Sequence, residues 1–343
     1  MSKKIPVTLQ SLARQLNIHV STISRVLQGN EDIASKAASK ETIERIRKLA
    51  AQHGYQPNPH AISLRTQKSR LIGVSVPRLS DYIWASIYEG IEEAALKEDY
   101  FAYVTNSYEQ PVLRRRQADL ARSRRVDGVI FGDIHTTRES LDFLQSLTFP
   151  FVLVLRKAGD HLCAVCDDRD GGRQAAQHLF ERGHRQVAVI GGSEITSTGL
   201  ERTAGFTDFY REAGCPIARE HILFSAFDTQ AGRDCAQRLI SAFPSLTAIY
   251  AVNDFAAIGA MGAIREAGLT PGANMALVGY NDTPLAAELP IPLSTVDNPV
   301  RELGARALDL LLRLLRGESC TDVLLKPRLV VRESSGFTAR PVP

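Results

Sequence analysis

The stretch TLQSLARQLNIHVSTISRVL, which runs from Thr8 to Leu27, decides the fold of the amino-terminal part of this chain. Its apolar residues recur at helical spacing in two short runs on either side of Asn17. We therefore expect two amphipathic helices joined by a tight turn, with the Thr8 hydroxyl as the cap of the first. The polar face of the second helix carries Arg25. This is the pattern of a helix-turn-helix unit, although any two amphipathic helices around a polar turn would also fit it.

The letters of this stretch are more specific than its pattern. LARQLNIHVSTISRVLQG closely resembles the headpiece of the LacI/GalR family of bacterial transcription regulators, and the resemblance continues through GYQPN and SLRT. Other short sequence motifs of the family follow in order: RVDG at 125–128, DD at 167–168, HL at 178–179, GHR at 183–185, ND at 253–254, GYND at 279–282 and PRLVVR at 327–332. The resemblance spans nearly the whole chain. It implies a DNA-binding regulator, most simply a repressor, that responds to a small molecule.

The resemblance also implies the domain organisation. We expect a small all-α helix-turn-helix headpiece over residues 1–57 and a hinge helix with linker over residues 58–70. Residues 71–343 should form an α/β, periplasmic-binding-protein-like domain of two lobes, which binds the effector and dimerises. A length of 343 residues, of which 44% are apolar, is enough for several cores.

Short apolar strands and amphipathic helices alternate after residue 70. Strands are predicted at 71–76, 101–105, 128–131, 150–155, 186–191, 247–252 and 275–280, and two of the helices at 84–98 and 111–124. Other helices end at Gly183, Gly214, Gly268 and Gly317, where glycine fits a left-handed cap. Apolar strands between such helices predict parallel sheets that are covered on both faces. In the family the chain passes between the lobes three times.

A third headpiece helix is predicted from Ser39, its N-cap, to about Gln52. It would close a three-helix core. Before it, the chain carries Ala34 to Ala38 where the family usually joins the flanking positions directly. We expect a longer loop or an extra helical turn there.

By the resemblance, Val20, Ser21 and Arg25 read base edges in the major groove, and Arg25 can donate two hydrogen bonds to guanine. His19 stands where the family has a serine N-cap, and histidine is a weaker cap. The segment from 36 to 70 is rich in lysine and arginine, which suits contacts to phosphates. The candidate DNA-binding residues are Thr8, Val20, Ser21, Thr22, Ser24, Arg25, Asn58 and Leu64.

The hinge helix should begin at Asn58, which precedes Pro59 and can cap it. In relatives this helix folds when two subunits meet on the operator, and it inserts a leucine into the minor groove. Leu64 is the matching residue, and such a wedge unstacks and kinks DNA. An ordinary linker contact is the alternative for Leu64.

The family also indicates an effector pocket between the lobes. Its candidate residues are Trp84, Thr198, Arg202, Phe227, Asn253 and Asn281. The two aromatic residues could instead be core residues, and Arg202 could form a surface ion pair. Sugar-binding relatives have an aspartate at the positions of Leu155 and Asn281. Arg202 would then face few carboxylates, and a buried guanidinium without a protein partner is costly, so the ligand could supply the negative charge. We expect an effector that is a sugar, a sugar acid or a related small carboxylate, and we favour an acid.

A pair of cysteines and a group of aspartates could suggest a metal or redox site, but both have simpler explanations. Cys163 and Cys166 have C-x-x-C spacing, but on a strand they point to opposite faces and no second pair completes a site. Near them lie Asp167 and Asp168, on a loop word of the family, and Asp170, which can cap the following helix. We expect neither a metal nor a cofactor.

An enzyme or a secreted solute-binding protein on the same α/β fold is the main alternative. The sequence contains no G-x-G-x-x-G after a strand, no phosphate loop, no G-x-S-x-G elbow and no H-E-x-x-H. The start MSKKIPVTLQ lacks the apolar core of a signal peptide. We expect a cytoplasmic homodimer without a membrane segment, which binds a palindromic double-stranded operator because its own symmetry is two-fold.

Overall fold

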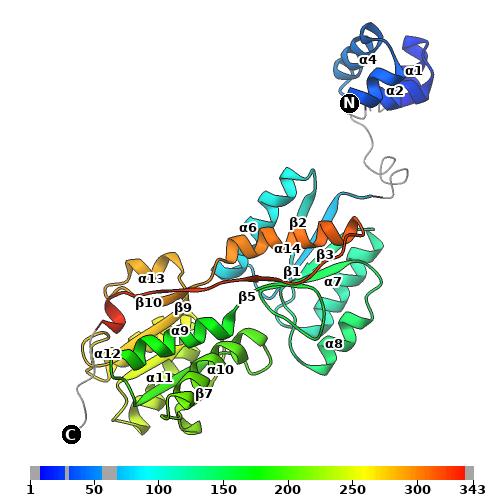
Figure 1. The fold of residues 1–343 in the computed structure, drawn as a ribbon. Coiled ribbons are helices and arrows are strands. Elements are labelled where there is room, and N and C mark those ends of the chain that lie inside the picture. Colours follow the sequence, from blue (N-terminus) through cyan, green and yellow to red (C-terminus); the bar gives the residue numbers. More distant parts are fainter. Residues whose placement is uncertain (1–7, 28–30, 56–67, 337–343) are drawn as a thin grey trace, which may run out of the picture. The chain divides into compact units, whose positions relative to one another are not determined.

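The computed structural model describes residues 8–27, 31–55 and 68–336, and the chain forms two compact units, residues 1–69 and 70–343. Figure 1 shows the elements of each unit. The predictions for Asn58 and Leu64 lie outside the described residues.

The headpiece is all helical in its described part. Thr8 caps the first helix as predicted: its hydroxyl accepts the Ser11 N–H at 3.2 Å, and the Ser11 hydroxyl oxygen accepts the Thr8 N–H at 2.9 Å. Asn17 then ends this helix in the left-handed conformation, with φ of 52°. The helices are α1 (Leu9–Leu16), α2 (Val20–Leu27), α3 (Glu31–Ala37) and α4 (Lys40–Gln52). They share one apolar core, built on Leu12, Ile23, Val26, Ala34, Ile43, Ile46 and Ala50.

The predicted three-helix core was wrong by one helix. The insertion forms most of α3, so its helical turn is confirmed, and residues 8–27 and 31–55 contain four helices. The Ala34 side chain has no exposed surface, and its small size lets α3 pack closely on the core. Glu31 at the start of α3 forms an ion pair with Arg47 of α4 at 2.8 Å. The helix predicted from Ser39 is therefore the fourth, α4, and Ser39 does cap it.

The larger unit contains two lobes, each built on a six-stranded sheet. The first sheet has the order β11-β5-β4-β3-β1-β2 and its strands are parallel. The elements of this first lobe are β1 (Leu71–Val76), α6 (Tyr82–Lys97), β2 (Phe101–Asn106), α7 (Pro111–Ser123), β3 (Gly128–Phe131), α8 (Arg138–Gln145), β4 (Phe151–Val154), β5 (Cys163–Cys166), α14 (Val300–Leu315) and β11 (Val323–Leu325).

The second sheet has the order β12-β10-β9-β8-β6-β7, and β12 pairs antiparallel with β10. The elements of this second lobe are α9 (Asp168–Glu181), β6 (Val187–Gly191), α10 (Ser197–Glu212), a 3₁₀ turn (Arg219–His221), β7 (Ile222–Phe224), α11 (Thr229–Ala242), β8 (Ala248–Ala251), α12 (Asp254–Glu266), β9 (Ala276–Asn281), α13 (Pro284–Glu288), β10 (Ser294–Asp297), β12 (Arg328–Val330) and a 3₁₀ turn (Glu333–Ser335).

Helices cover both faces of each sheet, as the apolar strands predict. In the first lobe α6 and α14 enclose one core and α7 and α8 the other, while in the second lobe α11 and α12 lie opposite α9 and α10. The four predicted helix-ending glycines all have a positive φ. Cys163 and Cys166 face the two different cores of the first lobe, which confirms that they point to opposite faces of β5. Burial raises the pKa of both thiols to about 12.

The chain crosses between the lobes three times, at residues 166–168, 297–300 and 325–328. The three crossings run side by side in Figure 1. At the first crossing the prediction for Asp170 was wrong. The cap of α9 is Asp167, whose Oδ1 accepts the Asp170 N–H at 3.0 Å, because α9 already begins at Asp168.

Candidate functional site

The headpiece presents the predicted DNA-reading residues on α2. Ile23 and Val26 are buried in the core, whereas Arg25 is exposed and Val20, Ser21, Thr22 and Ser24 are half-buried. The sequence from Thr8 to Leu27 contains no carboxylate. Neither α1 nor α2 therefore carries a carboxylate that would repel phosphates, which suits a DNA-facing helix.

His19 caps α2, although histidine is an unusual cap. Its Nδ1 accepts the backbone N–H of Ser21 at 3.3 Å, and the Ser21 hydroxyl lies 2.7 Å from the same nitrogen. The imidazole thus satisfies one of the free N–H groups at the start of the helix. The helix start is therefore capped, with histidine in the place of the serine that the family usually has.

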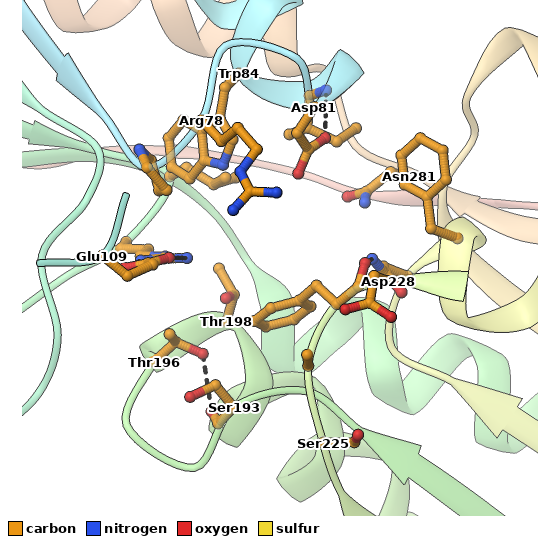
Figure 2. Close-up of a pocket in the computed structure, with 18 of the residues that line it drawn as sticks. Arg78, Asp81, Trp84, Glu109, Ser193, Thr196, Thr198, Ser225, Asp228 and Asn281 are labelled. Atoms are coloured by element: carbon orange, nitrogen blue, oxygen red, sulfur yellow. Dashed lines mark hydrogen bonds and ion pairs between the residues drawn. The ribbon is translucent and has the colours of Figure 1, made fainter. Parts of the chain in front are cut away.

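A cavity of about 750 Å³ lies between the two lobes of the larger unit. Figure 2 shows Arg78, Asp81 and Trp84 on one side of it and Thr196 and Ser193 on the other. All six predicted effector residues line this cavity, namely Trp84, Thr198, Arg202, Phe227, Asn253 and Asn281. The structure therefore brings together residues that are almost 200 positions apart in the sequence.

The wall from the first lobe is built around Arg156. Its guanidinium donates to Glu109 through two contacts of 2.9 and 3.2 Å and lies 5.4 Å from the centre of the Trp84 ring. His135 also contacts Glu109, with Nε2 at 2.6 Å from Oε2. Burial acts to raise the pKa of Glu109, but the hydrogen bond with His135 and the charge of Arg156 outweigh it and lower the pKa to about 2. Arg156 is thus neutralised by a protein carboxylate.

The wall from the second lobe is built around Arg202, which is only 2% exposed. Its Nε donates to Asp168 at 2.8 Å, its Nη1 donates to the Val252 carbonyl at 2.9 Å, and it lies 3.8 Å from the centre of the Tyr280 ring. The carboxylate of Asp168 keeps the pKa of Arg202 above its usual value in spite of burial. The alternative of a surface ion pair was wrong, because the pair is buried.

Arg202 needs no negative charge from a ligand, because Asp168 supplies one. An acidic ligand was expected only because Arg202 was taken to lack a partner in the protein. Sequence reasoning missed Asp168 because the two residues lie 34 positions apart, on α10 and α9. Leu155 does line the cavity, so the expected aspartate is absent from that position.

The two predicted asparagines have different surroundings. Asn253 caps α12, and its Nδ2 donates to the Phe227 carbonyl at 2.7 Å, so it holds the Phe227 loop in place. Asn281 has φ of 106° and accepts a hydrogen bond from Asn298 at 3.3 Å. The Asn281 amide nitrogen donates no hydrogen bond to a residue in the described ranges, whereas that of Asn253 donates to Phe227.

Further charged groups line the cavity that the sequence analysis did not identify. Arg78 forms no ion pair with the described residues and lies 6.0 Å from the centre of the Tyr108 ring. Asp81 and Asp228 each use one oxygen to cap a helix, α6 and α11, and keep the other for a ligand. Burial raises the pKa of Asp81.

One signal could have found these residues. Ligands of open parallel sheets bind at the carboxyl ends of the strands, and most of the missed groups follow the predicted strands within a few residues. They are Arg78 after β1, Glu109 after β2, His135 after β3, Arg156 after β4 and Ser193 after β6. Asp228 follows β7, a strand that was not predicted.

Two glycines seat the two aromatic side chains of the cavity. A Cβ on Gly132 would lie 2.3 Å from the Trp84 ring, and a Cβ on Gly192 would lie 2.1 Å from the Phe227 ring. Each glycine follows directly on β3 or β6, so the strand ends let the rings approach the backbone. Trp84 is buried while Phe227 is half-buried, which makes Trp84 the more rigid of the two.

The lobes also touch each other at the edge of the cavity. The Thr136 N–H donates to the Ile195 carbonyl at 2.9 Å, and the Lys157 N–H donates to the Ser197 hydroxyl oxygen at 2.9 Å. These contacts join loops after β3 and β4 to the segment that leads into α10. They hold the two walls of the cavity together.

Over residues 8–27, 31–55 and 68–336 there is no cluster of three metal-ligating side chains that could hold an ion. The helices described there include none that is long and apolar enough to cross a membrane.

Comparison with known proteins gives matches over almost the whole chain. Residues 8–58 match the model of "Bacterial regulatory proteins, lacI family", and residues 69–333 match "Periplasmic binding proteins and sugar binding domain of LacI family". The transcriptional repressor PurR of Haemophilus influenzae is 27% identical over 95% of this chain and 98% of its own length.

Solved structures agree with these matches. A regulatory protein of the LacI family from Chloroflexus aggregans is 31% identical and covers 78% of this chain and 99% of its own, with a TM-score of 0.69. The Lac repressor bound to ONPG in the repressed state is 25% identical over 96% of this chain and 100% of its own, with a TM-score of 0.85.

Proposed function

The chain belongs to the LacI family of bacterial regulatory proteins, and from this premise we propose that it is a repressor that binds its operator as a homodimer. Binding to operator DNA and control by a small molecule are properties of this family of regulators. A repressor meets the bacterial chromosome in the cytoplasm, which we take to be its location. Since its relatives are regulators, we also propose that the cavity binds its ligand without converting it.

We propose the following division of roles in DNA binding. Val20, Ser21 and Arg25 on α2 read base edges, and Thr8, Thr22 and Ser24 contact the backbone nearby. Asn58 starts a hinge helix, and Leu64 is its minor-groove wedge. The exposure of Arg25 on a helix that lacks carboxylates supports the first of these roles. Two copies related by a two-fold axis would read a palindromic operator.

The ligand of the cavity, in our proposal, is an uncharged polyhydroxylated molecule such as a sugar. The observation that carries this choice is that Arg156 and Arg202 are already neutralised, by Glu109 and Asp168. The charges left for a ligand are those of Arg78, Asp81 and Asp228. One cation and two carboxylates do not favour an anion, but they donate to and accept from hydroxyl groups well.

The aromatic side chains support the same choice. Trp84 from the first lobe and Phe227 from the second supply apolar surface on both sides of the cavity. A sugar ring presents C–H groups on its faces and hydroxyl groups at its edge, so it needs both kinds of wall. The matching domain model is itself described as a sugar-binding domain.

Regulation follows if the ligand binds the two arrangements of the lobes with different affinity. It contacts both lobes, so it favours one arrangement and shifts the population towards it. The contacts Thr136 to Ile195 and Lys157 to Ser197 belong to the arrangement described here. The arrangement of the lobes would then decide whether the paired hinge helices form on the operator.

The test uses Trp84, the single tryptophan of the chain. Purified protein is titrated with neutral sugars and with sugar acids while its fluorescence is followed, and each ligand that binds is then added to the operator complex in a gel shift. We expect a saturable response to a neutral sugar and a change in operator affinity. Asp228→Asn should lower the affinity for this sugar about tenfold, because it removes one charged hydrogen bond. A response to acids alone would contradict the ligand class, and a ligand that leaves the operator complex unchanged would contradict regulation.

A further inference from the structure

The hydrogen bonds at the start of α2 fix more than a cap. Nδ1 of His19 is close to two groups of Ser21, the backbone N–H at 3.3 Å and the hydroxyl at 2.7 Å. A backbone N–H can only donate. Nδ1 must therefore be the ring nitrogen that carries the lone pair, and the neutral imidazole must carry its proton on Nε2.

This assignment determines the direction of the second hydrogen bond. Because Nδ1 carries no proton, the 2.7 Å contact forms only if the Ser21 hydroxyl donates to it. The hydroxyl proton of Ser21 is thus committed to His19. The Ser21 oxygen keeps its lone pairs, so towards any other partner it is an acceptor and not a donor.

The committed proton matters because of the place of Ser21 in the headpiece. Ser21 is the second residue of α2 and is half-buried, on the helix that follows the turn at Asn17. In helix-turn-helix proteins the first residues of this second helix contact base edges. In the major groove only adenine N6 and cytosine N4 donate, whereas guanine and thymine offer acceptors.

We infer that His19 is a positioning residue for sequence readout: it holds the Ser21 hydroxyl as an acceptor and so directs Ser21 to adenine or cytosine. A serine without this partner could donate or accept and would distinguish the bases poorly. The inference rests on the proposed function, because it requires that α2 enters the major groove. It assigns to His19 a role in specificity that capping alone does not supply.

The experiment separates capping from readout. The preferred operator of the full-length protein is selected from random duplexes, and affinities are then measured with each of the four base pairs at every position. The variants are His19→Ser, which keeps a good N-cap without the imidazole, Ser21→Ala, and both together. The position at which Ser21→Ala changes the preference is the position that Ser21 reads.

At that position the wild type should bind the duplex that carries the adenine N6 or cytosine N4 amino group about fivefold more tightly than a duplex in which purine or 2-pyrimidinone replaces that base and lacks the amino group, which is one hydrogen bond. His19→Ser should reduce this preference to below about twofold and leave the other positions unchanged. In the Ser21→Ala background His19→Ser should add nothing to the preference.

Three results would overturn the inference. They are an unchanged profile in His19→Ser, a wild-type affinity that does not fall when the exocyclic amino group at the Ser21 position is removed, and a uniform loss on all duplexes, which would show a structural role alone. If the wild type selects no motif at all, the proposed function fails and the inference fails with it. A motif that His19→Ser leaves unaltered contradicts only the inference.

Discussion

Nε of Arg202 donates to the carboxylate of Asp168 across 2.8 Å, and the two side chains are among the most deeply buried charges of the second lobe. Asp168 is the first residue of α9, directly after the first crossing between the lobes, while Arg202 lines the cavity. The pair therefore connects the ligand cavity to the crossing. It also leaves Arg202 without the excess charge that would call for an acidic ligand.

Asp168→Asn should reduce the free energy of unfolding by about 3 to 5 kcal/mol, because it leaves the buried guanidinium of Arg202 without a counter-charge. Thermal or urea denaturation followed by circular dichroism measures this loss. The matched control is Asp142→Asn, which removes the partner of Arg138 from an ion pair of 2.8 Å on the surface. Since Asp142 is 53% exposed, its loss should be below about 1 kcal/mol. Equal losses in the two variants would contradict the importance of burial.

The same substitution tests the charge of the cavity. With Asp168 neutral, Arg202 has a charge to offer, so sugar acids should gain affinity relative to neutral sugars by about tenfold. The Trp84 titration measures both affinities. If the wild type already prefers acids and Asp168→Asn does not change this preference, Asp168 does not neutralise Arg202 towards a ligand.

Two buried groups of the second lobe should give opposite pH dependences of stability. Burial raises the pKa of Asp254 to about 6, so its contribution is present at acid pH and is lost as the pH rises through 6. Burial lowers the pKa of His178 to about 4 from 6.5, so its contribution is present above 6.5 and is lost as the pH falls towards 4. Between pH 4 and 6 the two contributions largely cancel.

Single substitutions should expose each of them. In Asp254→Asn the unfolding free energy should rise with pH from 4 to 6.5, and in His178→Gln it should fall over the same range, each by up to about 3 kcal/mol relative to wild type. Urea denaturation at a series of pH values measures the slopes. Asp254 accepts three hydrogen bonds from Thr283 and Thr295 that asparagine can largely keep, so the variant should fold. Parallel profiles for all three proteins would show that neither residue titrates abnormally.

Gly132→Ala should disturb the cavity from behind. The new methyl group would lie 2.3 Å from the ring of Trp84, which is buried and has little room to move. We expect a shift of the tryptophan emission, a loss of about 1 to 3 kcal/mol of stability from overpacking, and weaker ligand binding. Gly192→Ala is the comparison, because the Phe227 ring that it displaces is half-buried and can swing aside. Gly192→Ala should weaken ligand binding and leave the stability nearly unchanged. If Gly192→Ala were less stable than Gly132→Ala, Trp84 would not be the more rigid of the two rings.

Arg25→Ala should weaken binding to the preferred operator far more than binding to random DNA, because it removes a base contact worth about 1 to 3 kcal/mol. A competition gel shift measures both affinities. Arg14→Ala removes the same charge from α1 and should cost similar affinity on both DNAs, since a charge effect does not depend on sequence. An equal loss on both DNAs for Arg25→Ala would assign Arg25 to a phosphate.

Local features of the fold were predictable, while contacts between distant residues were not. Periodicity located the longer apolar strands to within a few residues but did not identify β7, β10, β11 and β12. Thr8 and Ser39 were recognised as caps because a cap acts within one turn. Asp170 was wrongly predicted as the cap of α9, because several aspartates lie close together and the cap is Asp167. The resemblance to the family predicted all six cavity residues. The partner of Arg202 depends on how α9 packs against α10, which no local sequence pattern encodes.

The hinge prediction concerns residues 56–67, which the structure does not describe, and limited proteolysis tests it. Trypsin cleaves after Arg65, Lys68 and Arg70, close to Leu64. If the hinge helix folds only when two subunits meet on the operator, cleavage there should be fast in the free protein and at least about tenfold slower on operator, because a protease needs the locally unfolded chain. Random duplex at the same occupancy is the control and should protect much less, since phosphate contacts alone do not pair the hinges. Cleavage at other sites reports general shielding by DNA. Identical rates at the hinge with and without operator would remove the folding hinge, and with it the role of Leu64 as a wedge.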